Sequence, residues 1–164
     1  MESPSVGISS ALTAEQVVEL LGLGRHPEGG WYREIWRDVP ADGGRGTGTS
    51  IYYLLPAGEV SAWHRVDAVE IWHWYAGAGL ALTLYSGLPG TVSHCLGNDL
   101  VGGQRPQVIV PANVWQMAES LGDWTLVGCT VSPAFTFAGF ELASPGWQPQ
   151  AAAPLLGPDR TLTR

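Results

Sequence analysis

The sequence predicts an all-β domain, a sandwich or a barrel led by one short helix, and three observations favour this class. Runs of strand length, rich in β-branched and aromatic residues, follow one another through most of the chain. Twenty-two glycines and twelve prolines divide these runs at short intervals, as turns between strands require. No helical stretch intervenes, which excludes parallel βαβ winding and leaves the double-Greek-key jelly roll as the leading candidate.

The helix is predicted within TAEQVVELLGLG, near the start of the chain. Thr13 can cap its first turn, and Gln16 stands at the capping-box position. Gly22 or Gly24 ends it. The apolar stripe of this helix consists of Val17, Leu20 and Leu21.

Strands are expected from Trp31 onward, separated by turns such as Pro56–Gly58, Pro89-Gly90 and Gly102-Gly103. The domain is expected over residues 13–143, between a flexible N-terminus over 1–12 and a flexible C-terminal tail over 144–164. The runs that predict strands are WYREIWR, TSIYYLLP, EVSAWHRV, EIWHWYAG, LALTLYSG, TVSHCLG, QVIVP, VWQMAE and WTLVGCTV.

Composition restricts the partners of this chain of 164 residues, a length typical of one domain. The net charge of −7 argues against nucleic acid, which needs a basic face. No apolar run reaches the length of a membrane span, and the first residues lack the basic region of a signal peptide. Two cysteines, Cys95 and Cys129, are too few for a disulfide scaffold, so we expect reduced thiols in a cytoplasmic protein that binds a small molecule.

The residues that could perform chemistry gather in GEVSAWHRVDAVEIWHWYAG, residues 58–77. Because side chains alternate along a strand, His64 and Val66 share one face. Glu70 can open the next strand and point into the same cavity. Gln116 lies on a later strand, after the turn at Pro111–Asn113.

The spacing of these residues resembles the two cupin motifs. The positions of Gly58, His64, Val66, Glu70 and Gly77 match the first motif, in which Val66 would normally be a second histidine. PANVWQ resembles the second motif, with asparagine in place of the usual glycine and glutamine in place of the third histidine.

Longer blocks within residues 13–143 are similar to the cupin-5 family of RmlC-like cupins, also called DUF985. The resemblance implies a cupin-type double-stranded β-helix, a jelly-roll barrel with a pocket inside, usually in a homodimer. The usual functional comparison is with sugar-nucleotide epimerases of similar fold. The chain departs from the family pattern at Val69, where an acidic residue is common, and at Ala134, where glycine is common. The matching blocks are LGLGRHPEGGWYREIWR, SIYYLLPAGEVSAWHRV, EIWHWYAG, LGNDL, RPQVIVPANVWQ and LVGCTVSPAFTFAGFELA.

A metal site is one interpretation of the pocket, with His64, Glu70 and Gln116 as the ligands of a divalent ion. Gln116 offers only a neutral amide oxygen, and Val66 offers no ligand atom. Affinity depends on the type and number of ligands. We therefore expect no tightly held metal and no other cofactor.

A metal-free acid–base site is the interpretation we favour. His64 titrates near working pH, and Glu70 could orient its ring or hold its charged form. Such a pair suits proton abstraction beside a carbonyl, as in epimerases and ketoisomerases. Tyr32, Tyr52 and Tyr75 are the phenols available for the opposite proton transfer, and the catalytic residues proposed are His64, Glu70 and Tyr75.

A binding module without catalysis is the third interpretation. By alternation from Glu70, two tryptophans share its face, whereas His73 points the other way and suits an interface or the surface. The tryptophans that could line an apolar pocket are Trp63, Trp72, Trp74 and Trp115.

HPEGGWYRE, residues 26–34, allows two interpretations. His26 fits a turn that leads from the helix into the first strand. The segment could also close over the barrel mouth and present Tyr32 or Arg33, since arginine suits an anionic ligand. The residues proposed to bind substrate are Tyr32, Arg33, Tyr52, Trp72, Trp74 and Gln116.

Overall fold

A computed structural model describes residues 12–152. Residues 1–11 of the expected flexible N-terminus and residues 153–164 of the expected tail lie outside these described residues. Helix α1 spans Ala14–Leu21, and both hydrogen bonds of the predicted capping box, between Thr13 and Gln16, are present. Gly22 ends the helix in the left-handed conformation, with φ of 62°. The sequence therefore predicted both ends of this helix.

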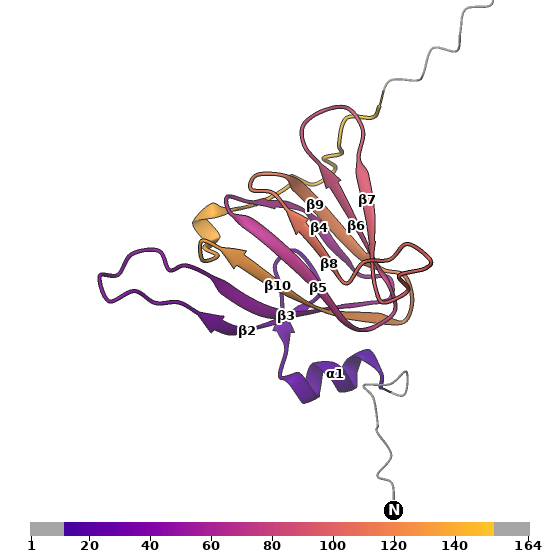
Figure 1. The fold of residues 1–164 in the computed structure, drawn as a ribbon, viewed down its shortest axis with the longest axis horizontal. Helices are drawn as coiled ribbons and strands as arrows, with labels where there is room; N and C mark the ends of the chain where they lie inside the picture. Colours follow the sequence, from indigo (N-terminus) through magenta and orange to yellow (C-terminus); the bar gives the residue numbers. More distant parts are fainter. Residues whose placement is uncertain (1–11, 153–164) are drawn as a thin grey trace, which may run out of the picture.

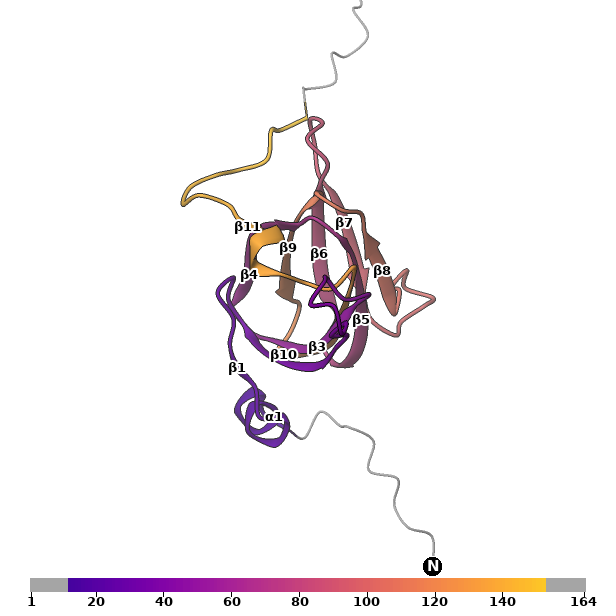
Figure 2. The ribbon, with the colours of Figure 1, turned by 90° about the vertical axis from the view of Figure 1, so that its left-hand side faces the viewer.

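The strands form two antiparallel sheets that wrap into a barrel (Figures 1 and 2). One sheet has the order β1-β2-β3-β10-β5-β8 and the other the order β11-β4-β9-β6-β7. This architecture confirms the predicted jelly-roll class. The elements are β1 (Gly24–Arg25), β2 (Trp31–Arg37), β3 (Thr49–Pro56), β4 (Val60–Val66), β5 (Val69–Gly77), β6 (Leu80–Tyr85), β7 (Val92–Leu96), β8 (Gln107–Val110), β9 (Trp115–Ser120), β10 (Trp124–Ser132), the 3-10 helix η1 (Phe137–Gly139) and β11 (Phe140–Leu142).

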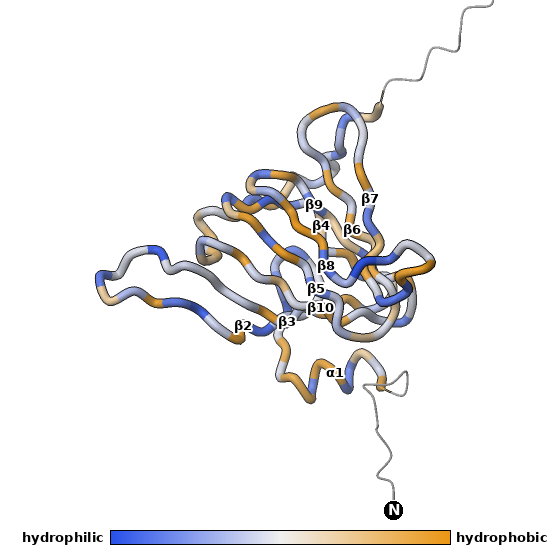
Figure 3. The backbone as a smooth tube through the Cα atoms, viewed as in Figure 1, coloured by the Kyte–Doolittle hydropathy of each residue, from blue (hydrophilic) through white to orange (hydrophobic). Residues whose placement is uncertain are grey.

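The main core fills the inside of the barrel between the two sheets. In β5, Glu70 and Trp72 are buried, as alternation from the sequence predicts. Figure 3 shows hydrophobic positions along β5 and helix α1. The buried residues of this core are Tyr53, Leu55, Trp72, Leu80, Leu82, Leu96, Val108, Val110, Ala118, Val127 and Cys129.

A second, smaller core lies outside the barrel, where helix α1 covers part of the six-stranded sheet (Figure 1). Val17 from the helix packs with Leu54 of β3 and with Trp124 and Leu126 of β10. This cluster covers part of the outer face of the sheet. The inner face packs the main core and faces the inside of the barrel.

The segment after β11 contacts the barrel at Trp147, and the Gln150 carbonyl accepts a hydrogen bond from the Gly90 N–H at 2.9 Å. The Trp147 ring centroid is 4.6 Å from that of Trp115 and 5.7 Å from that of Trp63. Aromatic packing holds this part of the tail, which its proline and alanine content does not reveal. None of the helices within residues 12–152 is long and apolar enough to cross a membrane.

Candidate functional site

A cavity of about 240 Å³ lies inside the barrel and is lined by residues from β2, β3, β4, β5, β10, η1 and β11. It combines two buried carboxyl groups and two histidines with an aromatic wall. The residues that line it are His26, Glu28, Tyr32, Glu34, Arg37, Thr49, Ile51, Tyr53, His64, Val66, Glu70, Cys129, Val131, Phe135, Phe137 and Phe140.

The turn between β1 and β2 carries Glu28 into this cavity. Gly29 and Gly30 have φ of 107° and 71°, a conformation that glycine adopts readily. A side chain at Gly29 would collide with the backbone oxygen of Val60. The hydroxyl of Tyr53 donates a hydrogen bond to the Gly29 carbonyl at 2.7 Å. These contacts hold the turn closely against the barrel.

Glu28 is the centre of a buried polar cluster. Its side chain is 8% exposed, and the Ser61 hydroxyl donates to Oε1 at 2.8 Å. Its other oxygen, Oε2, lies 3.3 Å from Nε2 of His64 and 3.5 Å from Nδ1 of His26. The sequence predicted a pair of His64 with Glu70. In the structure, Glu28 is the carboxyl group that lies against Nε2 of His64.

His64 enters the cluster from β4 and is 2% exposed. Its Nδ1 lies 2.8 Å from the carbonyl oxygen of Ala62, which fixes the orientation of the ring. Nε2 is thereby directed toward Glu28. Val66 follows two residues later and lines the same cavity, as the predicted shared face requires.

Glu70 belongs to a different hydrogen-bond network, although it also lines the cavity. Nε2 of Gln116 donates to Oε2 of Glu70 at 2.6 Å. Nε1 of Trp72 donates to Oε1 of Gln116 at 2.8 Å. Both ends of the Gln116 amide therefore have a protein partner, and Gln116 is not among the residues that line the cavity.

Burial shifts these ionisable groups toward their neutral forms. It raises the pKa of Glu28, against the opposing effect of His26, and it raises the pKa of Glu70, against that of His64. Burial also lowers the pKa of His64 and of His26. Perturbed groups that gather in a cavity are typical of functional sites.

The residues at the cupin ligand positions do not fit a metal ion. The amide oxygen of Gln116, the only ligand atom it could offer, already accepts the Trp72 N–H. Val66 offers none. Within residues 12–152, no group of three or more His, Cys, Asp or Glu side chains is arranged to hold a metal.

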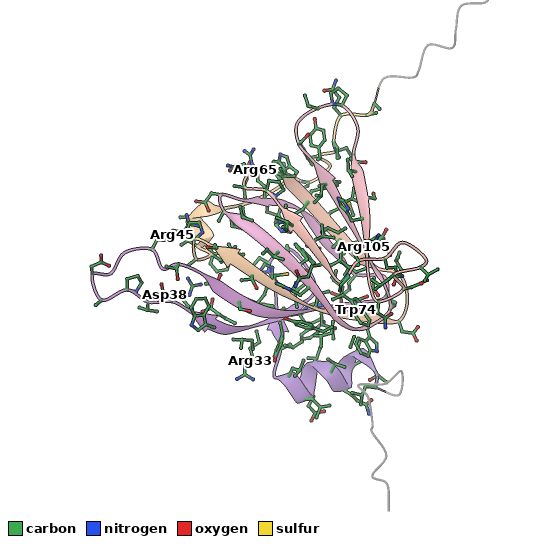
Figure 4. The ribbon with its side chains drawn as sticks, in the orientation of Figure 1. Arg33, Asp38, Arg45, Arg65, Trp74 and Arg105 are labelled. Atoms are coloured by element: carbon green, nitrogen blue, oxygen red, sulfur yellow. The ribbon has the colours of Figure 1, made fainter. Side chains whose placement is uncertain are left out.

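Of the residues predicted to serve the site, His64, Glu70 and Tyr32 line the cavity. Trp72 is buried in the core and does not line the cavity. It is linked to Glu70, which does, through the hydrogen bonds of Gln116. Trp74 packs against the core but lies at the other end of the barrel, near α1 (Figure 4). Alternation thus placed Trp74 on the inner face but could not show which end of the barrel it reaches.

Three other predicted residues lie outside the barrel. Tyr75 is 45% exposed, and its ring covers Gly128 on the outer face of the sheet. Tyr52 packs beside Tyr75, with ring centroids 6.2 Å apart, and against the core under α1. Arg33 is exposed and donates to the carbonyl of Leu21 at 3.1 Å (Figure 4). The structure does not bring these three side chains to the cavity.

The sequence predicted a turn for His26 and Glu28, and the structure has this turn, but the entry of both side chains into the cavity was not predicted. The signal that could have found them is the glycine pair after Glu28, because it allows a close backbone approach. Arg37 also lines the cavity, which the sequence did not predict. Its guanidinium pairs with both carboxylate oxygens of Glu34 and donates to the Phe135 carbonyl at 2.8 Å.

Comparison with known proteins identifies the family. The family described as "Cupin superfamily (DUF985)" matches residues 15–143. The search of curated proteins gave no match. Protein SO0799 from Shewanella oneidensis is 41% identical, with a TM-score of 0.77 over 81% of this chain and 85% of that one. A hypothetical protein from Leishmania major is 28% identical, with a TM-score of 0.74 over 81% and 88%.

A more distant neighbour is a dTDP sugar isomerase from Desulfovibrio desulfuricans. It is 17% identical, with a TM-score of 0.52 over 74% of this chain and 79% of that one. At this identity the likeness concerns the fold alone. The family match over residues 15–143, together with the antiparallel barrel, leads to one conclusion. The chain belongs to the DUF985 family of the cupin superfamily.

Proposed function

We propose that this protein is an isomerase or epimerase-like enzyme that moves a proton on a carbon beside a carbonyl group, without a metal. The observation that carries the proposal is the contact of 3.3 Å between Nε2 of His64 and Oε2 of Glu28 in the wall of the cavity. A buried imidazole beside a buried carboxyl group is suited to general acid–base catalysis.

The proposed step breaks one C–H bond of the substrate. The proton passes to the His64–Glu28 pair, and the electron pair moves onto the carbonyl oxygen as an enolate. Return of the proton to the same carbon gives epimerisation, and return to the neighbouring carbon gives isomerisation. Water exclusion by the aromatic wall strengthens the polar contacts that stabilise the enolate. Tyr32 and His26 line the cavity and are the groups we propose for the substrate oxygen.

The proposed substrate is a small, uncharged and polar carbonyl compound, of roughly monosaccharide size. A cavity of about 240 Å³ is small for a binding site. Arg37 is the arginine in the cavity lining, and its charge is paired with Glu34 at 2.6 Å. The arginines of residues 26–37 suggested an anionic ligand. Among the residues that line the cavity, however, no arginine is left unpaired to bind one.

Solvent hydrogen exchange tests the proposal directly. Uncharged aldoses, ketoses and hydroxyketones are incubated with the protein in deuterated water, and loss of the proton beside the carbonyl is followed by NMR. His64→Asn should abolish exchange while ligand affinity stays within about tenfold, because it removes chemistry more than binding. His73→Asn is the matched control, since His73 lies on the outer face of the sheet beside Gln107 and should leave exchange unchanged.

A binding protein without catalysis is the alternative, favoured by the aromatic part of the cavity wall. Phe135, Phe137 and Phe140 pack edge to face, with centroids 5.2 to 6.2 Å apart, beside Tyr32. Such a wall is suited to retaining an apolar face of a ligand. If carbonyl compounds bind and none exchanges, the enzyme proposal is abandoned in favour of this alternative.

We also propose that the protein is a cytoplasmic homodimer. The sheet edge at β8 supports association, because open edges are commonly covered by a partner. Cys95 and Cys129 are both unpaired thiols, which suits a reducing compartment. Sedimentation at micromolar concentration should give twice the mass of the chain, and a monomer would contradict the dimer.

A further inference from the structure

The hydrogen bonds of His64 determine which of its ring nitrogens carries hydrogen. The carbonyl oxygen of Ala62 can only accept, so Nδ1 of His64, 2.8 Å away, must donate. If the ring is neutral, Nε2 then has a lone pair and no hydrogen. This lone pair is directed at Oε2 of Glu28, 3.3 Å away.

The same reasoning applies to His26. The backbone N–H of Glu28 can only donate, and it lies 3.3 Å from Nδ1 of His26. Nδ1 of His26 is therefore without hydrogen, and the ring is neutral with its hydrogen on Nε2. Nδ1 is also 3.5 Å from Oε2 of Glu28, so it too turns a lone pair toward that oxygen.

Oε2 of Glu28 would thus face two nitrogen lone pairs without any hydrogen between them. Ser61 donates to the other oxygen, Oε1, and the Tyr53 hydroxyl donates its hydrogen to the Gly29 carbonyl. No other charged side chain of the described residues forms an ion pair with Glu28 than these two histidines. A buried carboxylate left in this arrangement is strongly unfavourable, and one added proton removes the conflict.

We propose that Glu28 and His64 hold one proton between them, and that in the resting protein it is on the Glu28 carboxyl group. Glu28 then donates to Nε2 of His64, and both histidines are neutral. The burial of all three groups, which raises the pKa of Glu28 and lowers those of His26 and His64, favours the same arrangement. Glu28 then carries the proton of the resting site, and His26 presents a fixed Nε2–H.

The use of this proton in catalysis rests on the proposed function, whereas its position in the resting protein does not. Nitrogen-15 NMR of the histidine rings measures that position in the protein without any substrate. His64→Asn and His26→Asn assign the two rings. At pH 7 we expect a neutral His64 with hydrogen on Nδ1 and a neutral His26 with hydrogen on Nε2. A doubly protonated His64, or a neutral one with hydrogen on Nε2, would overturn the inference.

Glu28→Gln gives a second measurement, because an amide resembles the protonated acid. Its NH2 group can donate to Nε2 of His64 while its oxygen accepts from Ser61. The His64 signals should therefore keep the pattern of the neutral Nδ1–H form. A change from a charged ring in the natural protein to a neutral ring in this variant would show that the proton had been on His64. If the NMR pattern is as expected and no compound exchanges, the proposed function fails and the proton assignment stands.

Discussion

Two buried carboxyl groups lie in one cavity wall, and their surroundings differ. Glu28 and Glu70 are 8% and 7% exposed, and burial raises the pKa of both. Glu70 accepts a hydrogen bond of 2.6 Å from Gln116, whose oxygen is in turn occupied by Trp72. Glu28 accepts a hydrogen bond from Ser61 and otherwise lies beside the Tyr53 hydroxyl and two histidine rings.

Under the proposed function, this difference separates a structural carboxyl group, Glu70, from a chemically active one, Glu28. Glu70 has a partner that suits its ionised form and belongs to the core beside Trp72. Glu28 has partners that suit its protonated form, and a proton can move between it and His64. Burial and pKa direction alone do not distinguish the two groups, whereas the donors and acceptors around each one do.

The largest expected effect is on proton exchange. Glu28→Gln should reduce the exchange rate at least about 100-fold, the usual contribution of a general acid or base. Glu70→Gln should reduce it by less than about tenfold, because an amide oxygen can still accept from Gln116. Rates for both variants are measured by NMR in deuterated water with the same substrate. Equal losses would contradict the distinction between the two carboxyl groups.

Stability should depend strongly on the network of Glu70 and Gln116. Gln116→Leu leaves the Glu70 carboxyl group and the Trp72 N–H buried without partners. We expect the free energy of unfolding to fall by about 3 kcal/mol. Gln107→Leu is the matched control, since Gln107 is exposed on β8 and its loss should change stability by less than about 0.5 kcal/mol. Urea unfolding of both variants gives the comparison, and a loss under about 1 kcal/mol for Gln116→Leu would show that solvent replaces its hydrogen bonds.

The sequence was sufficient for the helix, the strands and one face of the site. Capping at Thr13 and termination at Gly22 depend on neighbouring residues, so local pattern predicts them. His64, Val66 and Glu70 share the cavity because alternation along β4 and β5 determines the face of each side chain.

Contacts between distant segments explain what the sequence did not reveal. Glu28 enters the cavity because its backbone oxygen accepts from Ala62 at 2.8 Å, a contact across more than thirty residues. Tyr75 lies where the register of β5 against β10 shifts, and its ring rests on Gly128. The periodicity of a sequence describes each strand by itself. It therefore predicts neither the contact of the Glu28 turn with Ala62 nor the packing of Tyr75 on Gly128.

The pH dependence of stability gives the last and smallest expected effect. The pKa of Glu28 in the folded protein lies above the ordinary value of 4.5. At a pH between the pKa of Glu28 in the unfolded protein and its higher pKa in the folded protein, the folded state holds more protons than the unfolded state. The contribution of Glu28 to stability is therefore fully present below about pH 4.5 and is lost as the pH rises toward the pKa of the folded protein. His26 and His64, with lowered pKa values, act in the opposite direction below pH 6.5.

Glu28→Gln isolates the contribution of Glu28, because the variant cannot ionise at this position. Its free energy of unfolding, relative to that of the natural protein, should rise with pH by up to about 1.4 kcal/mol per unit above about pH 4.5. Glu70→Gln should also show a rise, because burial raises the pKa of Glu70 against the opposing effects of His64 and of the Gln116 amide. Urea unfolding at pH 5, 6 and 7 provides the slopes. A flat difference for Glu28→Gln would mean that the carboxyl group is ionised in the folded state, and the charge would then have to be balanced by a protonated His64.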